Sequence, residues 1–115
     1  MAGLTTHVLD TANGCPAEGM QVRLFVAGDP EPLFSGATNA DGRCDAPLLT
    51  PEQVKVGQYV LEFGVGDYFR AKGHKLPDPA FLERVSISFG LADVDSHYHV
   101  PLLVSPFAYS TYRGS

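Results

Sequence analysis

Apolar and polar residues alternate along four segments of the chain, the period of two that is typical of a β-strand with one buried face. The apolar positions are Val22, Leu24 and Val26; Tyr59, Leu61, Phe63 and Val65; Val85, Ile87, Phe89 and Leu91; and Tyr98, Val100, Leu102 and Val104. Turn-forming residues separate the segments, at 13–14, 28–30, 39–42, 76–79 and 105–106. The pattern predicts an all-β protein built as a sandwich of two sheets.

One short helix is predicted at residues 67–72. Asp67 would cap its first turn and Gly73 would end it. The sequence shows no internal repeat and no linker. A chain of 115 residues therefore predicts a single domain that spans residues 1–115.

Strand alternation also assigns the polar residues to faces. If Val8 faces the core, the neighbouring positions of the first strand face outward, and the same reasoning holds for the strand of Val100 and for the last segment of the chain. The expected outer-face residues are Thr5, His7 and Leu9; His97, His99, Pro101 and Leu103; and Ala108, Ser110, Tyr112 and Gly114. This face would combine histidines with an apolar patch, which on a small protein more often marks an interface or a groove than bare surface.

Composition narrows the possible partners. The chain is 44% apolar and 18% charged, and it has 8 Lys and Arg against 13 Asp and Glu, a formal charge of −5. An acidic chain without a basic stripe argues against a nucleic-acid partner. No apolar run approaches the roughly 18 residues that would cross a bilayer, so no membrane partner is expected.

The N-terminus and the cysteines bear on location. Residues 1–4 lack a basic region followed by an apolar stretch, so no signal peptide is expected. Cys15 and Cys44 have no CxxC spacing. A disulfide between them is possible, but two free thiols in a reducing compartment is the preferred interpretation, and it predicts a cytoplasmic protein.

Taken singly, each candidate for chemistry has an ordinary explanation. His7 and His99 could be solvated strand residues, and Arg43 an exposed turn residue. His97 and His99 share a strand face and could form a zinc site, but this spacing alone is a weak signal. Arg43 could instead orient a planar ligand or stabilise developing negative charge. The sequence lacks the GxSxG motif of serine hydrolases, and it also lacks a phosphate-binding glycine loop.

Five motifs, taken together, favour a functional interpretation of these residues over the ordinary ones. They are Leu4-Thr5-Thr6-His7-Val8-Leu9-Asp10, Asp41-Gly42-Arg43, His97-Tyr98-His99-Val100-Pro101-Leu102-Leu103, Ser105-Pro106 and Tyr109-Ser110-Thr111-Tyr112-Arg113-Gly114-Ser115. In sequence and spacing they closely resemble the transthyretin-related 5-hydroxyisourate hydrolases, over essentially the full chain. The terminal Tyr-Arg-Gly-Ser is the most specific motif, because transthyretin proper, the hormone carrier of the same fold, lacks it.

The resemblance implies a transthyretin-like sandwich of about eight strands with one short helix. It implies hydrolysis of 5-hydroxyisourate to 2-oxo-4-hydroxy-4-carboxy-5-ureidoimidazoline in urate catabolism, without a metal or other cofactor. It also implies a homotetramer, a dimer of dimers, with active sites along a channel between the dimers. The outer-face residues expected to line that channel are Leu9, Pro101, Leu103 and Ser110.

The site residues follow from the same resemblance. The catalytic residues would be His7, Arg43 and His99, with His97 a neighbour. The substrate-binding residues would be His7, Arg43, Tyr112, Arg113, Gly114 and Ser115. Three rival interpretations stay open: a non-catalytic carrier of a flat aromatic ligand, a metal-binding domain built on the two strand histidines, and a structural interaction module.

Overall fold

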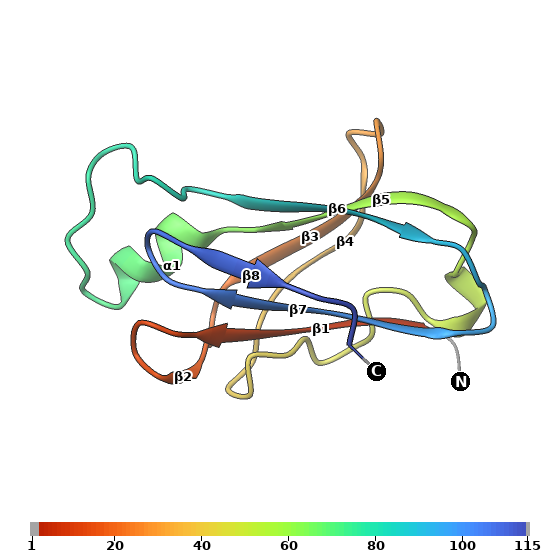
Figure 1. Cartoon of the computed structure of the whole chain (residues 1–115), viewed down its shortest axis with the longest axis horizontal. Helices are drawn as coiled ribbons and strands as arrows, with labels where there is room; N and C mark the ends of the chain where they lie inside the picture. The colour runs from red at the N-terminus through yellow and green to blue at the C-terminus, as the bar shows by residue number, and fades with distance from the viewer. Residues whose placement is uncertain (1–2, 115) are drawn as a thin grey trace.

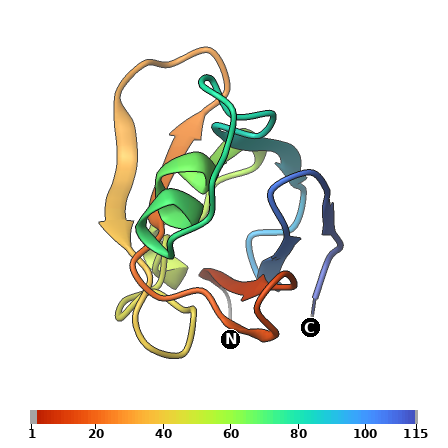
Figure 2. The same ribbon diagram turned by 90° about the vertical axis from the view of Figure 1, so that its left-hand side faces the viewer.

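The computed structural model describes residues 3–114, which form two β-sheets packed face to face with one α-helix at an end of the sandwich (Figures 1 and 2). The elements are β1 (Gly3–Asp10), β2 (Cys15–Pro16), β3 (Gln21–Val26), β4 (Pro32–Ala37), the 3-10 helix η1 (Pro51–Gln53), β5 (Gly57–Phe63), α1 (Val65–Ala71), β6 (Val85–Leu91), β7 (His97–Val104) and β8 (Tyr109–Thr111). The predicted all-β sandwich of two sheets, with about eight strands and one short α-helix, is confirmed.

The strand order is β2-β1-β7-β8 in one sheet and β4-β3-β5-β6 in the other. All neighbouring strands are antiparallel except β1 and β7. These two run parallel and pair over their whole lengths, so a segment near the start of the sequence lies beside one near its end. The tail that follows β8 runs back beside β7, toward the end of the sandwich where the chain begins (Figure 1). The parallel pair and this tail together position the site.

The core lies between the inner faces of the sheets, where the alternating apolar residues meet. Burying one such Leu, Val or Phe side chain contributes about 1.5–3 kcal/mol. The largest buried side chains include Leu4, Leu24, Leu61, Phe63, Phe69, Leu91 and Leu102. The predicted inner faces are confirmed except at Val26, which ends β3 and is 39% exposed.

The helix begins two residues earlier than the sequence predicted. Val65 was expected to be the last inward residue of a strand, but it is the first residue of α1, because it and Phe69 are four residues apart and both are fully buried. The N-cap is Gly64, so Asp67 is not the cap and lies in the first turn. The predicted end is confirmed: Gly73 follows the C-cap with φ +89°, a conformation that favours glycine.

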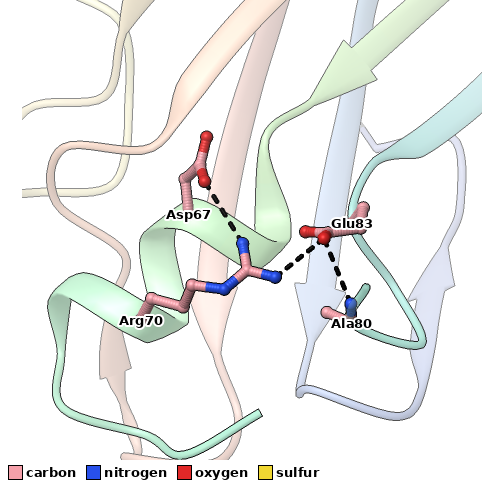
Figure 3. Close-up of polar contacts among 4 residues, drawn as sticks. All are labelled: Asp67, Arg70, Ala80 and Glu83. Atoms are coloured by element: carbon pink, nitrogen blue, oxygen red, sulfur yellow. Dashed lines mark hydrogen bonds and ion pairs between the residues drawn. The ribbon is translucent and has the colours of Figure 1, made fainter. Parts of the chain in front are cut away.

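An ion-pair cluster fastens α1 to the segment that precedes β6 (Figure 3). Arg70 donates to Glu83 at 2.7 Å and to Asp67 at 3.3 Å. Glu83 also accepts the backbone N–H of Ala80 at 3.1 Å. Because these side chains are partly or fully exposed, the cluster orients the loop more than it stabilises the fold.

The alternation pattern did not indicate β2 and β4. Neither strand contains a buried residue, and both lie at sheet edges, so they carry little apolar signal. Cys15 and Cys44 are both free thiols. Within the described part of the chain, no helix is long and apolar enough to cross a membrane.

Candidate functional site

Four backbone segments pair side by side in the β2-β1-β7-β8 sheet and along its edges: the segment of Arg43, β1, β7 and the tail. Arg43 forms an antiparallel bridge with His7 of β1, and His99 of β7 forms one with Gly114 of the tail. Between them, the parallel register places Thr5 opposite His99. Because neighbouring strands lie about 4.8 Å apart, this arrangement brings the three expected catalytic residues and the tail onto one surface.

The side chains reach this surface through strand alternation. In β1, Leu4, Thr6 and Val8 are buried in the sandwich, whereas Thr5 and His7 are only half-buried. In β7 the same contrast separates the buried inner positions from His97 and His99, which are half-buried. Pro101 has the outward parity but is buried, since it lies between β1 and β8.

Asn39 organises the turn that carries Arg43. Its side-chain oxygen accepts the backbone N–H groups of Asp41 at 2.9 Å and of Arg43 at 3.2 Å. Its own N–H donates to the carbonyl of Arg43 at 2.7 Å. Gly42 adopts φ +76°, and a Cβ there would lie 2.4 Å from the carbonyl oxygen of Val8. Only glycine therefore lets the turn approach β1 so closely.

The turn also fixes the hydrogen on the ring of His7. Nε2 of His7 lies 2.8 Å from the backbone carbonyl oxygen of Asp41. A carbonyl oxygen can only accept a hydrogen bond, so Nε2 carries the hydrogen. In the neutral ring, Nδ1 is then the nitrogen that can accept a proton.

Burial and neighbouring positive charge lower the pKa of His99. Burial is the largest cause because it disfavours the imidazolium, and Arg43, His7 and His97 act in the same direction. The main chain of Thr5 opposes them and raises the pKa. Because the net pKa lies below the ordinary value of 6.5, His99 is neutral at pH 7 and able to accept a proton.

The tail lies directly against the ring of His99. Gly114 donates its backbone N–H to the carbonyl of His99 at 2.7 Å. A Cβ at position 114 would lie only 2.6 Å from Cδ2 of His99, so a larger residue would displace either the tail or the ring. Tyr112 is 60% exposed, and Ser115 lies outside the described residues.

Arg113 is not brought toward the histidines. The register that pairs Gly114 with His99 places Arg113 opposite Val100, an inner-face residue. Its guanidinium accordingly lies 4.1 Å from the ring centroid of Tyr98, on the other side of the sheet from His99. The contact is a cation–π interaction, which holds the tail in place from the inner side of the sheet.

The expected channel residues form a row beside the histidines. Leu9 pairs with Leu103, and Leu103 pairs with Ser110, so the three lie across β1, β7 and β8. The two leucines are half-buried and Ser110 is exposed. On the other side of the site, a cavity of about 210 Å³ lies between Thr5 and the segment at 43–47.

The two strand histidines share a hydroxyl partner. Oγ1 of Thr5 lies 2.9 Å from Nδ1 of His99 and 3.2 Å from Nε2 of His97. Over residues 3–114, no group of three or more His, Cys, Asp and Glu side chains could hold a metal ion. The sequence placed Thr5 on the outer face but gave it no role, because the parallel pairing of β1 with β7 is not visible in the pattern.

Comparison with known proteins identifies relatives along the whole chain. The model of the HIUase/Transthyretin family matches residues 4–114. A protein of Ralstonia nicotianae named 5-hydroxyisourate hydrolase is 57% identical, and the match covers 100% of both chains.

Two solved structures have the same fold. The structure of Klebsiella pneumoniae 5-hydroxyisourate hydrolase has a TM-score of 0.83 and 36% identity, with 100% of both chains covered. The crystal structure of an (S)-allantoin synthase has a TM-score of 0.91 and 45% identity. That match covers 99% of this chain but only 44% of the longer synthase chain, so it concerns less than half of that protein.

Proposed function

The chain belongs to the HIUase/transthyretin family, and from this we infer that it is a 5-hydroxyisourate hydrolase, which opens the ring of its substrate to give 2-oxo-4-hydroxy-4-carboxy-5-ureidoimidazoline in urate catabolism. The identity with 5-hydroxyisourate hydrolases over the whole chain supports the reaction. The observation that carries the site assignment is the placement of His99 on one surface with Arg43, His7 and the tail, where burial and the charge of Arg43 lower its pKa.

The reaction needs an activated water molecule. Ring opening begins when water attacks an amide-type carbonyl, and water is a poor nucleophile at neutral pH. A positioned base accelerates such a step by about 10²–10⁴-fold. His99 is suited to this role because its lowered pKa keeps it unprotonated. His7 holds the water from the neighbouring strand, with Nδ1 as its available acceptor.

Arg43 supplies the positive charge of the site. Its guanidinium lowers the pKa of His99 and so preserves the free base. The same charge binds the anionic substrate and stabilises negative charge that develops on the attacked carbonyl. The product carries a carboxylate, for which the planar guanidinium is a good hydrogen-bonding partner.

The tail forms the remaining wall of the pocket. Tyr112 packs against the flat substrate ring, and Gly114 leaves room for it beside His99. Ser115, the last of the expected substrate-binding residues, lies outside the described residues. Arg113 contributes indirectly, since its contact with Tyr98 fastens the tail. These groups complete the reaction without a cofactor.

The assembly is a homotetramer, a dimer of dimers. β6 and β8 are edge strands, so each can pair with the same strand of a second copy. The row of Leu9, Leu103 and Ser110 then faces the opposite dimer across a channel. The protein acts in the cytoplasm, where Cys15 and Cys44 remain reduced.

The test is to mix the protein with freshly generated 5-hydroxyisourate and follow its ultraviolet absorbance against spontaneous decay. Wild-type protein should remove the substrate much faster than the uncatalysed reaction. His99→Ala and His7→Ala should both lose most of this rate while keeping the wild-type circular dichroism spectrum, since neither side chain belongs to the core. Full turnover in either variant would reject its assigned role, and ligand binding without turnover in the wild type would favour a carrier.

A further inference from the structure

We propose that Thr5 is a positioning residue, whose hydroxyl links His99 to His97 and thereby determines which ring nitrogen of His99 is free to accept a proton. The proposal rests on the proposed function, in which His99 is the base. It also gives His97 a role, as the far end of a chain of hydrogen bonds.

The link follows from the parallel pairing of β1 with β7. This register places Thr5 opposite His99, and His97 is two residues earlier on the same face of β7. Oγ1 of Thr5 consequently contacts both rings, at 2.9 Å to Nδ1 of His99 and at 3.2 Å to Nε2 of His97. A hydroxyl has one hydrogen, so it donates to one ring and accepts from the other. The tautomers of the two histidines are therefore coupled.

Two observations give the direction of this coupling. A hydrogen bond with the main chain of Thr5 raises the pKa of His99, and hydrogen bonds that the ring donates favour its charged form. Because Nδ1 is the ring nitrogen that lies beside Thr5, at 2.9 Å from Oγ1, this direction fits a hydrogen on Nδ1. In addition, Cδ2, the carbon bonded to Nε2, is the ring atom of His99 closest to a Cβ built on Gly114. Nδ1 thus faces Thr5, the Cδ2 edge of the ring faces the tail, and Nε2, the neighbour of Cδ2, is the nitrogen on the side away from Thr5. Thr5 accepts from Nδ1–H of His99 and donates to Nε2 of His97.

This arrangement supports proton transfer in both directions. An O–H bond of the attacking water breaks and its proton moves to Nε2 of His99. The ring then carries a positive charge, and the hydrogen bond from its Nδ1–H to Thr5 becomes stronger. When the C–N bond of the substrate breaks, the same proton passes to the released nitrogen. Thr5 therefore stabilises the imidazolium in a site that otherwise disfavours it.

Among residues 3–114, the charged and titratable groups that act on His99 come from three elements: His7 on β1, Arg43 on the 39–43 turn and His97 on β7 itself. All three lower the pKa of His99. Removal of the Thr5 hydroxyl takes away an interaction that favours the charged ring, so it should lower that pKa further.

The direct test is ¹⁵N NMR of the histidine rings in the full-length protein near neutral pH, assigned with single His→Asn variants. Wild type should show a hydrogen on Nδ1 and none on Nε2 at His99, and none on Nε2 at His97. Thr5→Val keeps the shape but should give mixed tautomers, and Thr5→Ser should restore them. Wild-type protein with the hydrogen on Nε2 of His99 would overturn the proposal.

The kinetic test uses the same variants with 5-hydroxyisourate. Thr5→Val should lower kcat by about tenfold to a hundredfold, the effect of one lost hydrogen bond to a charged group, with little change in KM. The acidic limb of its pH–rate profile should move to lower pH. Thr6→Val is the matched control, because Thr6 is the adjacent residue and donates into the sandwich, to the carbonyl of Val100 at 2.6 Å.

The two tests separate this proposal from the proposed function. The tautomers are observed without substrate, so expected tautomers in a protein that does not hydrolyse 5-hydroxyisourate would support the link and reject the function. An active enzyme whose tautomers and pH profile do not respond to Thr5→Val would reject the link and leave the function standing. Thr6→Val should lower stability while its pH–rate profile stays that of the wild type.

Discussion

At the scale of single residues, Gly114 is the position where a small change should have the largest effect on the site. A methyl group there would lie 2.6 Å from Cδ2 of His99, well inside van der Waals contact. Gly114→Ala should therefore displace the ring and lower kcat by about tenfold to a hundredfold, because small errors in the position of a base are costly.

Steady-state kinetics, together with thermal unfolding, would check this expectation. Gly36→Ala is the control, since its Cβ would meet only the end of the Phe34 ring, in the other sheet. Equal activity in Gly114→Ala and wild type would mean that the tail does not position His99.

Arg43 and His99 give a second prediction at this scale, in the pH dependence. The pKa of His99 is lowered by burial first and by Arg43 next, so wild-type activity should fall only when the pH drops below 6.5. Arg43→Gln removes one positive charge and should raise the pKa of His99 toward its ordinary value. An NMR titration of the His99 ring measures this shift without substrate, and an unchanged or lower pKa would contradict it.

At the scale of elements, the turn at 39–43 contacts two of the proposed catalytic groups from beside the sheet. The side chain of Asn39 holds the backbone of Asp41 and Arg43, and the carbonyl of Asp41 in turn holds His7. Asn39→Ala should lower the free energy of unfolding by about 1–2 kcal/mol. It should also reduce activity about tenfold, because both Arg43 and His7 lose their support.

Urea denaturation and steady-state kinetics with the same protein samples would test the turn. Gln21 offers a control, since its amide also donates to a side chain, that of Ser35 at 3.2 Å, but on the opposite sheet. Gln21→Ala should leave activity unchanged. Loss of stability without loss of activity in Asn39→Ala would mean that the turn has no part in positioning the site.

The elements also show how far the sequence could predict this structure. Long strands with one buried face, such as β6 and β7, were predicted because burial alternates along them. The edge strands β2 and β4 contain no fully buried residue and left no such signal. The start of α1 was placed too late, because the short apolar spacing of Val65 and Phe69 can be read as either a strand or a helix.

The site was only partly predictable for a similar reason. Alternation placed His7 and His99 on outer faces, and the resemblance supplied Arg43. The sequence pattern does not contain strand register, so it could not reveal that Thr5 lies between two histidines or that Arg113 turns to the inner side. Both findings come from which residues lie opposite each other, which depends on the folded sheet.

At the scale of the whole molecule, a buried carboxylate couples stability to pH. Asp10 is fully buried, yet hydrogen bonds from Asn13 and Tyr68 outweigh the effect of burial and lower its pKa. A lowered pKa in the folded state contributes stability above the ordinary value of 3.8, and this contribution is lost as the pH falls through the folded value.

Asp10→Asn should thus lower the free energy of unfolding by about 1–3 kcal/mol at pH 7 and by less in acid, where the wild-type carboxyl is protonated. Urea denaturation between pH 3 and pH 7, at one protein concentration, measures both values. A constant difference across this range would show that the charge of Asp10 is not what stabilises the fold.

Assembly provides the last prediction, because the proposed channel requires two dimers. Leu103 lies in the middle of the row that would face the second dimer, between Leu9 and Ser110. In Leu103→Glu, a charge would be buried between dimers, which is strongly unfavourable unless it is paired. The variant should elute as a dimer in size-exclusion chromatography with light scattering, and its activity should fall with the tetramer fraction.

Leu33→Glu is the control, since Leu33 is 48% exposed on the opposite sheet. A fully active dimer, or a tetramer that persists in Leu103→Glu, would mean that this face does not join the dimers.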